Sequence, residues 1–85
     1  MSYIEQLTEL EAVPTSEEAA FYKLLGYNIR KARQKKGWEQ ANLSDAMGIS
    51  QSQMSKFETG GNRIPLFDLL RVAQVLDVRW QSLVP

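Results

Sequence analysis

The chain contains no cysteine and no histidine among its 85 residues. Without cysteine it forms no disulfide and offers no thiolate as a nucleophile or a metal ligand. Without histidine it lacks the side chain that most often serves as a general base or binds a metal near neutral pH. Glu17 and Glu18 are adjacent carboxylates, but acidic residues are common at a helix N-terminus and no nucleophile accompanies them. We therefore expect no enzyme activity, no metal site and no cofactor.

Long apolar runs are also missing. No stretch approaches the roughly 18 residues that a membrane span needs. The N-terminus lacks the basic region and apolar stretch of a secretory signal. These absences predict a cytoplasmic protein that has no membrane partner.

The charge is balanced overall but unevenly distributed. Ten basic and ten acidic residues give a net charge of zero. Residues 1–18 hold five acids and no base, so residues 19–85 carry all ten bases against five acids, an excess of five positive charges. This asymmetry is compatible with nucleic-acid binding by the basic part, and also with a solvated acidic tail on an ordinary domain. Charge alone does not choose between these two interpretations.

Helical periodicity runs along the chain without strand-like alternation or repeats, and it predicts an all-α fold. Residues 1–14 are an acidic amphipathic segment with a short expected helix over 2–12. A break at Val13-Pro14-Thr15 separates this helix from the main domain, residues 15–85. The helices expected in that domain span 15–36, 40–47, 50–58 and 65–76, with a short turn at 80–83. The residues that the last helix is expected to bury are Leu66, Leu69, Ala73 and Leu76.

Two of these helices and the turn between them are the informative feature. Helices 40–47 and 50–58 are joined by Gly48, which can adopt the left-handed conformation of a tight turn. Ser50 and Gln53 form a capping box at the start of the second helix, whose outer face has no carboxylate. A face that enters a groove lined by phosphates should avoid acids and offer hydrogen-bonding groups. The outer residues are Gln51, Ser52, Ser55, Lys56 and Thr59.

The pattern from Leu25 to Leu83 resembles the phage repressor and Cro type (XRE-like) of helix-turn-helix regulator. The matching positions are Leu25-Gly26, Ile29-Arg30, Arg33, Gly37, Gln40, Leu43, Gly48-Ile49-Ser50, Met54, Phe57-Glu58, Gly60, Pro65, Leu69-Leu70, Ala73, Leu76 and Val78. The resemblance implies a five-helix lambda-repressor-like domain, here with an extra short N-terminal helix. It also implies that helix 50–58 docks in the major groove of double-stranded DNA, and that the protein is of bacterial or phage origin.

The resemblance implies roles for individual residues. Base contacts are expected from Gln51, Ser52, Ser55 and Lys56. Phosphate contacts are expected from Gln40, Thr59 and Arg63. Arg33 and Glu58 match a pair that forms an internal salt bridge, so their expected role is structural. Ile64 and Leu66 stand where basic residues often hold the backbone, which implies fewer ionic contacts with DNA.

The function that follows is a transcriptional regulator, acting as a repressor, that binds a near-palindromic operator as a homodimer. A domain this small contacts few phosphates, and two copies raise its affinity. The expected dimer interface is the apolar C-terminal part, with Val78, Trp80, Leu83 and Val84. The alternative is an antitoxin or protein-binding adaptor of the same fold, which uses residues 1–14 to bind a partner protein. The two functions can coexist in one chain.

Overall fold

The structure is a computed structural model, and it describes residues 16–85. The acidic segment of residues 1–14 and its expected helix over 2–12 lie outside the described residues. The regular elements of residues 16–85 are all helical, as predicted, with no strand in this part of the chain. This part contains four α-helices and one short 3₁₀ helix. The expected count of five helices is therefore not confirmed, and the additional N-terminal helix falls outside residues 16–85. None of these helices is long and apolar enough to cross a membrane.

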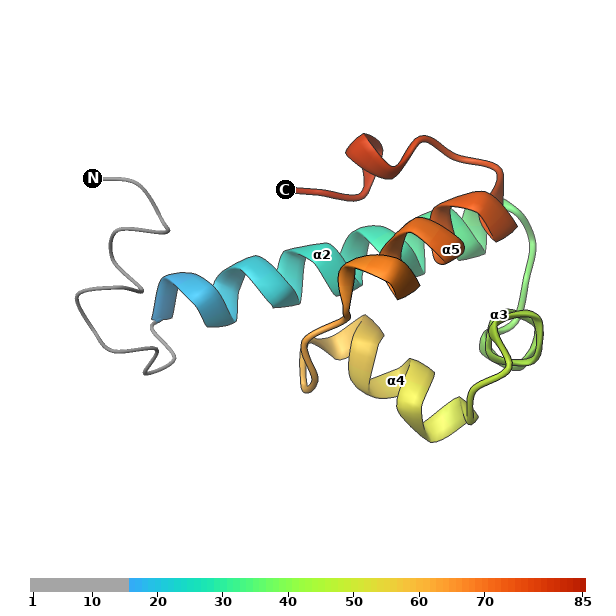
Figure 1. Cartoon of the computed structure of the whole chain (residues 1–85), viewed down its shortest axis with the longest axis horizontal. Helices are drawn as coiled ribbons and strands as arrows, with labels where there is room; N and C mark the ends of the chain where they lie inside the picture. Colours follow the sequence, from blue (N-terminus) through green and yellow to red (C-terminus); the bar gives the residue numbers. More distant parts are fainter. Residues whose placement is uncertain (1–15) are drawn as a thin grey trace.

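The long helix α2 (Ser16–Lys35) runs along the length of the molecule (Figure 1). Helix α4 (Gln51–Thr59) packs on one side of α2, and α5 (Leu66–Leu76) lies against its C-terminal half. Helix α3 (Gln40–Met47) closes the end of the molecule between α4 and α5. The short helix η1 (Trp80–Ser82) brings the C-terminal residues back toward α2, where the Asn28 side chain donates a hydrogen bond to the Leu83 carbonyl at 2.9 Å.

All four α-helices contribute to one apolar core. Ile29, Leu43, Met54 and Val72, one from each α-helix, are fully buried at its centre. Burial of each such side chain contributes about 1.5–3 kcal/mol to folding. The expected burial of Leu66 is wrong, because its exposed fraction is 66%. Leu66 occupies the first position of α5, just after Pro65, and the preceding Ile64 enters the core in its place.

The turn between α3 and α4 has the predicted glycine and serine cap, but the Gln53 side-chain oxygen accepts from Asn62 Nδ2 at 3.4 Å and does not complete the expected capping box. Gly48 has a φ of 69°, in the left-handed region that a side chain disfavours. Ser50 caps α4, since its hydroxyl oxygen accepts a hydrogen bond from the Gln53 backbone N–H at 3.0 Å. At Gly26 the backbones of α2 and α4 approach so closely that a Cβ atom would overlap the carbonyl oxygen of Phe57. The approach fixes α4 against the long helix.

Candidate nucleic-acid interface

Helix α4 has one buried side and one polar, exposed side. Met54, Phe57 and Glu58 face the interior of the domain. Of the residues expected to contact DNA from this helix, Ser55 is half-buried and four are exposed: Gln51, Ser52, Lys56 and Thr59. The exposed side carries one positive charge and no carboxylate. Its chemistry therefore suits a surface that meets a polyanion.

Below this face lies a buried ion pair between α2 and α4. The Arg33 Nε and Nη2 atoms donate to the two carboxylate oxygens of Glu58 at 2.8 and 3.0 Å. Nη1 of the same guanidinium donates to the Trp38 carbonyl at 2.8 Å. The hydrogen bond to Glu58 is the main cause that raises the pKa of Arg33 above its usual value, although burial opposes it. A base whose pKa rises on folding stabilises the fold below its ordinary pKa, so this stabilisation persists throughout the physiological range.

Two side-chain amides connect the ion pair to the start of α4. Gln40, at the first position of α3, donates from Nε2 to Glu58 Oε1 at 3.2 Å. Gln51 then donates from its own Nε2 to Gln40 Oε1 at 3.3 Å. The Gln51 amide keeps its carbonyl oxygen and a second N–H hydrogen for another partner. Gln40 and Gln51 were expected to have separate roles, but their side chains lie in one chain of hydrogen bonds.

Thr59, from which a phosphate contact is expected, already makes hydrogen bonds within its own helix. It is the last residue of α4, and its hydroxyl donates to the carbonyls of Ser55 at 3.0 Å and Lys56 at 3.3 Å. A hydroxyl has a single hydrogen, which these two carbonyls share. A hydrogen bond from Thr59 to a phosphate therefore requires that the hydroxyl turn away from both carbonyls.

Arg63, in the loop after α4, has an acidic neighbour that sequence reasoning missed. Its Nε lies 2.8 Å from Oε1 of Glu18, and the side chains are 56% and 6% exposed, respectively. From the sequence, Glu18 was expected only as an acid at a helix N-terminus. A usable signal was present, since Glu18 falls in the same helical stripe as the inward-facing Leu25 and Ile29.

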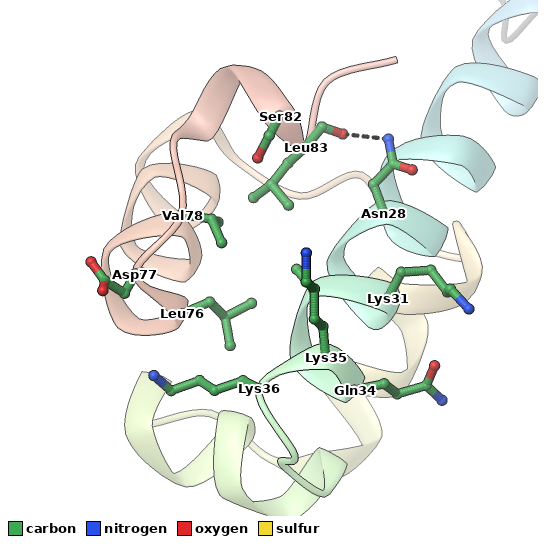
Figure 2. Close-up of a pocket in the computed structure, with 11 residues that line it drawn as sticks. Asn28, Lys31, Gln34, Lys35, Lys36, Leu76, Asp77, Val78, Ser82 and Leu83 are labelled. Carbon is green, nitrogen blue, oxygen red and sulfur yellow. Dashed lines mark hydrogen bonds between the residues drawn. The ribbon is translucent and has the colours of Figure 1, made fainter.

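Two surface pockets are lined by residues that were expected to contact DNA or a second subunit. One, of about 370 Å³, lies beside α4 and brings together Gln40, Ser55 and Thr59. The other, of about 930 Å³, lies between α2 and the C-terminal end of α5, on residues that include Lys35, Leu76 and Val78 (Figure 2). Of the residues expected at the dimer interface, Val78 and Leu83 line this second pocket. Within residues 16–85 no group of three or more carboxylates is close enough to hold a metal ion.

The C-terminal residues differ in how much surface they offer. Trp80 is 43% exposed, whereas Val78 and Val84 are partly buried and pack against the core. The expectation that Leu83 is exposed is wrong: it is 1% exposed because the C-terminal segment folds back onto α2. Exposed apolar side chains also occur on α5, at Leu66, Phe67 and Leu70, where sequence analysis did not expect them.

Comparisons with known proteins match this geometry. The helix-turn-helix model HTH_3 matches residues 29–83. The restriction-modification controller protein C.AhdI from Aeromonas hydrophila is 28% identical with a TM-score of 0.72, over 75% of this chain and 97% of that one. The transcription factor NHTF from Neisseria, described as hypothetical, is 29% identical with a TM-score of 0.71, over 76% and 75% of the two chains.

A third structure is that of SinR, the master regulator for biofilm formation, in complex with DNA. It is 30% identical with a TM-score of 0.63, over 69% of this chain and 95% of that one. No curated protein matches the chain. Because the family model covers more than half of the chain, and the buried Arg33–Glu58 pair and glycine turn lie inside it, the protein belongs to the HTH_3 helix-turn-helix family.

Proposed function

We propose that this protein is a transcriptional regulator that binds double-stranded DNA in a sequence-specific manner. One observation carries the proposal: α4 presents an acid-free polar face whose first residue, Gln51, is held by a chain of hydrogen bonds from the buried Arg33–Glu58 pair. A side chain that is oriented before binding loses less entropy when it meets a base. The similar SinR, which was solved with DNA, supports the same conclusion.

In this proposal α4 lies in the major groove. Base edges meet the side chains of Gln51, Ser52, Ser55 and Lys56. The DNA backbone meets Gln40 at the start of α3, Thr59 at the end of α4, and Arg63 in the following loop. The Gln40 amide has one further N–H hydrogen for a phosphate, beside the one it gives to Glu58. For Thr59 the contact requires rotation of the hydroxyl away from Ser55.

The active species in this proposal is a homodimer on a near-palindromic operator, and it represses by occupying a promoter. The α4 helices of the two subunits then lie about 34 Å apart, which is one turn of DNA. Val78, Trp80 and Val84 form the dimer interface, with Trp80 as the side chain that has most surface to bury.

The test is a selection from a pool of random duplexes at a stated salt concentration. We expect one enriched half-site motif, repeated in inverted orientation, and binding about 10³-fold or more tighter than to an unrelated duplex. Enrichment of no sequence, together with equal affinity for all duplexes, would contradict sequence-specific binding.

A second function is proposed for residues 1–14, as a segment that binds a partner protein in the manner of an antitoxin or adaptor. The observation that favours it is the sequence pattern of Tyr3, Leu7 and Leu10 on one helical stripe, accompanied by three acids. If DNA binding survives removal of the segment while the biological activity is lost, the segment serves a partner and not the operator.

A further inference from the structure

Glu18 is a charged residue with almost no access to water. Its exposed fraction is 4%, although it lies in the first turn of α2, where acidic residues are normally solvated. Its Oε1 atom lies 2.8 Å from the Nε atom of Arg63, whose side chain is more than half exposed. Removal of a carboxylate from water is costly, and an ion pair with an exposed partner returns little stability. The contact therefore places a buried carboxylate beside one end of an exposed guanidinium group.

The loop that carries Arg63 is fixed to both neighbouring helices. Gly60 has a φ of 81°, and a Cβ atom there would lie 2.8 Å from the backbone nitrogen of Lys23, so the loop touches α2 directly. The Asn62 backbone N–H donates to the Lys56 carbonyl at 3.3 Å, and Ile64 enters the core. The backbone on both sides of Arg63 is thus held. The Arg63 side chain is the part whose orientation the backbone does not fix, and its Nε lies against the Glu18 carboxylate.

The two ends of the Arg63 guanidinium group face different surroundings. Nε lies against the Glu18 carboxylate, while the Nη1 and Nη2 groups carry four further N–H hydrogens. Two of these hydrogens can bind one phosphate in a two-point contact. Because the side chain is ordered by Glu18 before DNA arrives, its entropy is lost on folding and not on binding.

We propose that Glu18 is a positioning residue, which holds Arg63 so that its Nη groups meet a phosphodiester of the DNA backbone. The inference rests on the proposed DNA-binding function and extends it to a residue in the first turn of α2. A carboxylate close to a phosphate also repels it, so the charge of Glu18 and its positioning act in opposite directions. A test has to separate these two effects.

Two substitutions at this position achieve the separation. Glu18→Gln and Glu18→Ala remove the same charge, but glutamine keeps an oxygen at the position that faces Arg63 Nε. Affinity for a duplex, measured by fluorescence anisotropy, should be about threefold or more tighter for Glu18→Gln than for Glu18→Ala. In an Arg63→Ala background the difference should disappear. The matched control is Glu17, an exposed neighbour in the same turn, for which the Gln and Ala variants should bind equally.

Thermal unfolding shows which of these variants are folded at the temperature of the binding assay. A second test does not need Glu18→Ala: Arg63→Lys keeps the charge, but a lysine bonded to Glu18 has no separate group for the phosphate. Its affinity should fall close to that of Arg63→Ala, and wild-type affinity for Arg63→Lys would overturn the proposal. Equal affinities of folded Glu18→Gln and Glu18→Ala would also overturn it while leaving the DNA-binding function intact. Absence of DNA binding by the wild-type protein would instead reject both.

Discussion

At the scale of residues, the Arg33–Glu58 pair connects stability to the proposed interface. Both side chains are buried, at 8% and 3% exposed, and their oxygens and nitrogens make a two-point contact. The same carboxylate accepts from Gln40, which accepts from Gln51. A change at this pair should therefore affect both the fold and the orientation of the first residue of α4.

Loss of one partner should be more damaging than loss of both. Arg33→Ala leaves the Glu58 carboxylate buried without its cation, and we expect a loss of about 3–5 kcal/mol in the free energy of unfolding. The double variant Arg33→Met, Glu58→Leu should lose less, because no buried charge remains. Urea unfolding measures both. The exposed Lys31→Ala is the control, and an Arg33→Ala midpoint as high as that of Lys31→Ala would contradict a structural role for the pair.

Arg63 tests the electrostatic part of the proposal. Arg63→Gln should weaken binding to all sequences about equally and reduce the slope of log affinity against log salt by roughly one. The measurement is a salt titration on the selected operator and on an unrelated duplex. A change in which sequence is preferred would show that Arg63 contacts a base and not a phosphate.

At the scale of elements, the start of α4 is fixed by a single side chain. The Ser50 hydroxyl satisfies the Gln53 backbone N–H, which has no partner within the helix. Ser50→Ala should cost about 1 kcal/mol of the free energy of unfolding. Ser52→Ala makes the same chemical change two residues along, on the exposed face of the same helix, and should stay within about 0.5 kcal/mol of wild type. Equal losses at the two positions in urea unfolding would show that Ser50 is not the cap.

The helices themselves were predictable from the chain, because each start or stop has local chemistry. Gly48 and Ser50 mark the turn into α4, and the observed helix begins one residue after the predicted cap. The end of α5 was less marked, since Asp77 takes the left-handed conformation there with a φ of 56°. No sequence rule requires Asp at that position, although short polar residues tolerate it.

Contacts between elements were harder to predict than the elements. The Arg33–Glu58 partnership came from the family resemblance, and helical periodicity alone does not pair residues 25 positions apart. The Glu18–Arg63 contact spans 45 positions and has no counterpart in that resemblance. Leu66 was assigned to the core by its spacing, but periodicity does not show where a helix extends beyond the packed interior. Such pairings depend on how helices cross, which local patterns do not encode.

At the scale of the whole molecule, the acidic segment of residues 1–14 is expected to affect DNA affinity but not folding. Deletion of residues 1–14 removes Glu5, Glu9 and Glu11 and no base, so non-specific DNA affinity should rise. The truncated chain should still unfold cooperatively, because residues 16–85 contain the core described above. The measurements are anisotropy on an unrelated duplex and a urea titration. Loss of the cooperative transition would show that Tyr3, Leu7 and Leu10 belong to the core.

The proposed homodimer can be tested for its existence and for the location of its interface. Sedimentation at tens of micromolar should show a dimer, and Trp80→Ser should shift it toward monomer, since Trp80 has the largest apolar surface in the proposed interface. Phe67→Ser makes an equivalent change on the exposed face of α5 and should leave the dimer intact. The opposite result would move the interface to α5. A wild-type protein that is strictly monomeric, free and on DNA, would contradict the dimer altogether.

In the proposed complex α4 contacts base edges in the major groove, and substitution of Gln51 is the sharpest test of these contacts. Its amide can donate to adenine N7 and accept from N6, and Gln51→Ala should cost about 1–3 kcal/mol per half-site at one A·T pair. The measurement is the affinity of both proteins for the selected operator and for the same operator with 7-deazaadenine, which lacks N7, at each adenine in turn. We expect one position where the analogue weakens binding of the wild type but not of Gln51→Ala. If the two proteins respond alike at every adenine, Gln51 does not contact one and the proposed role of this residue is contradicted.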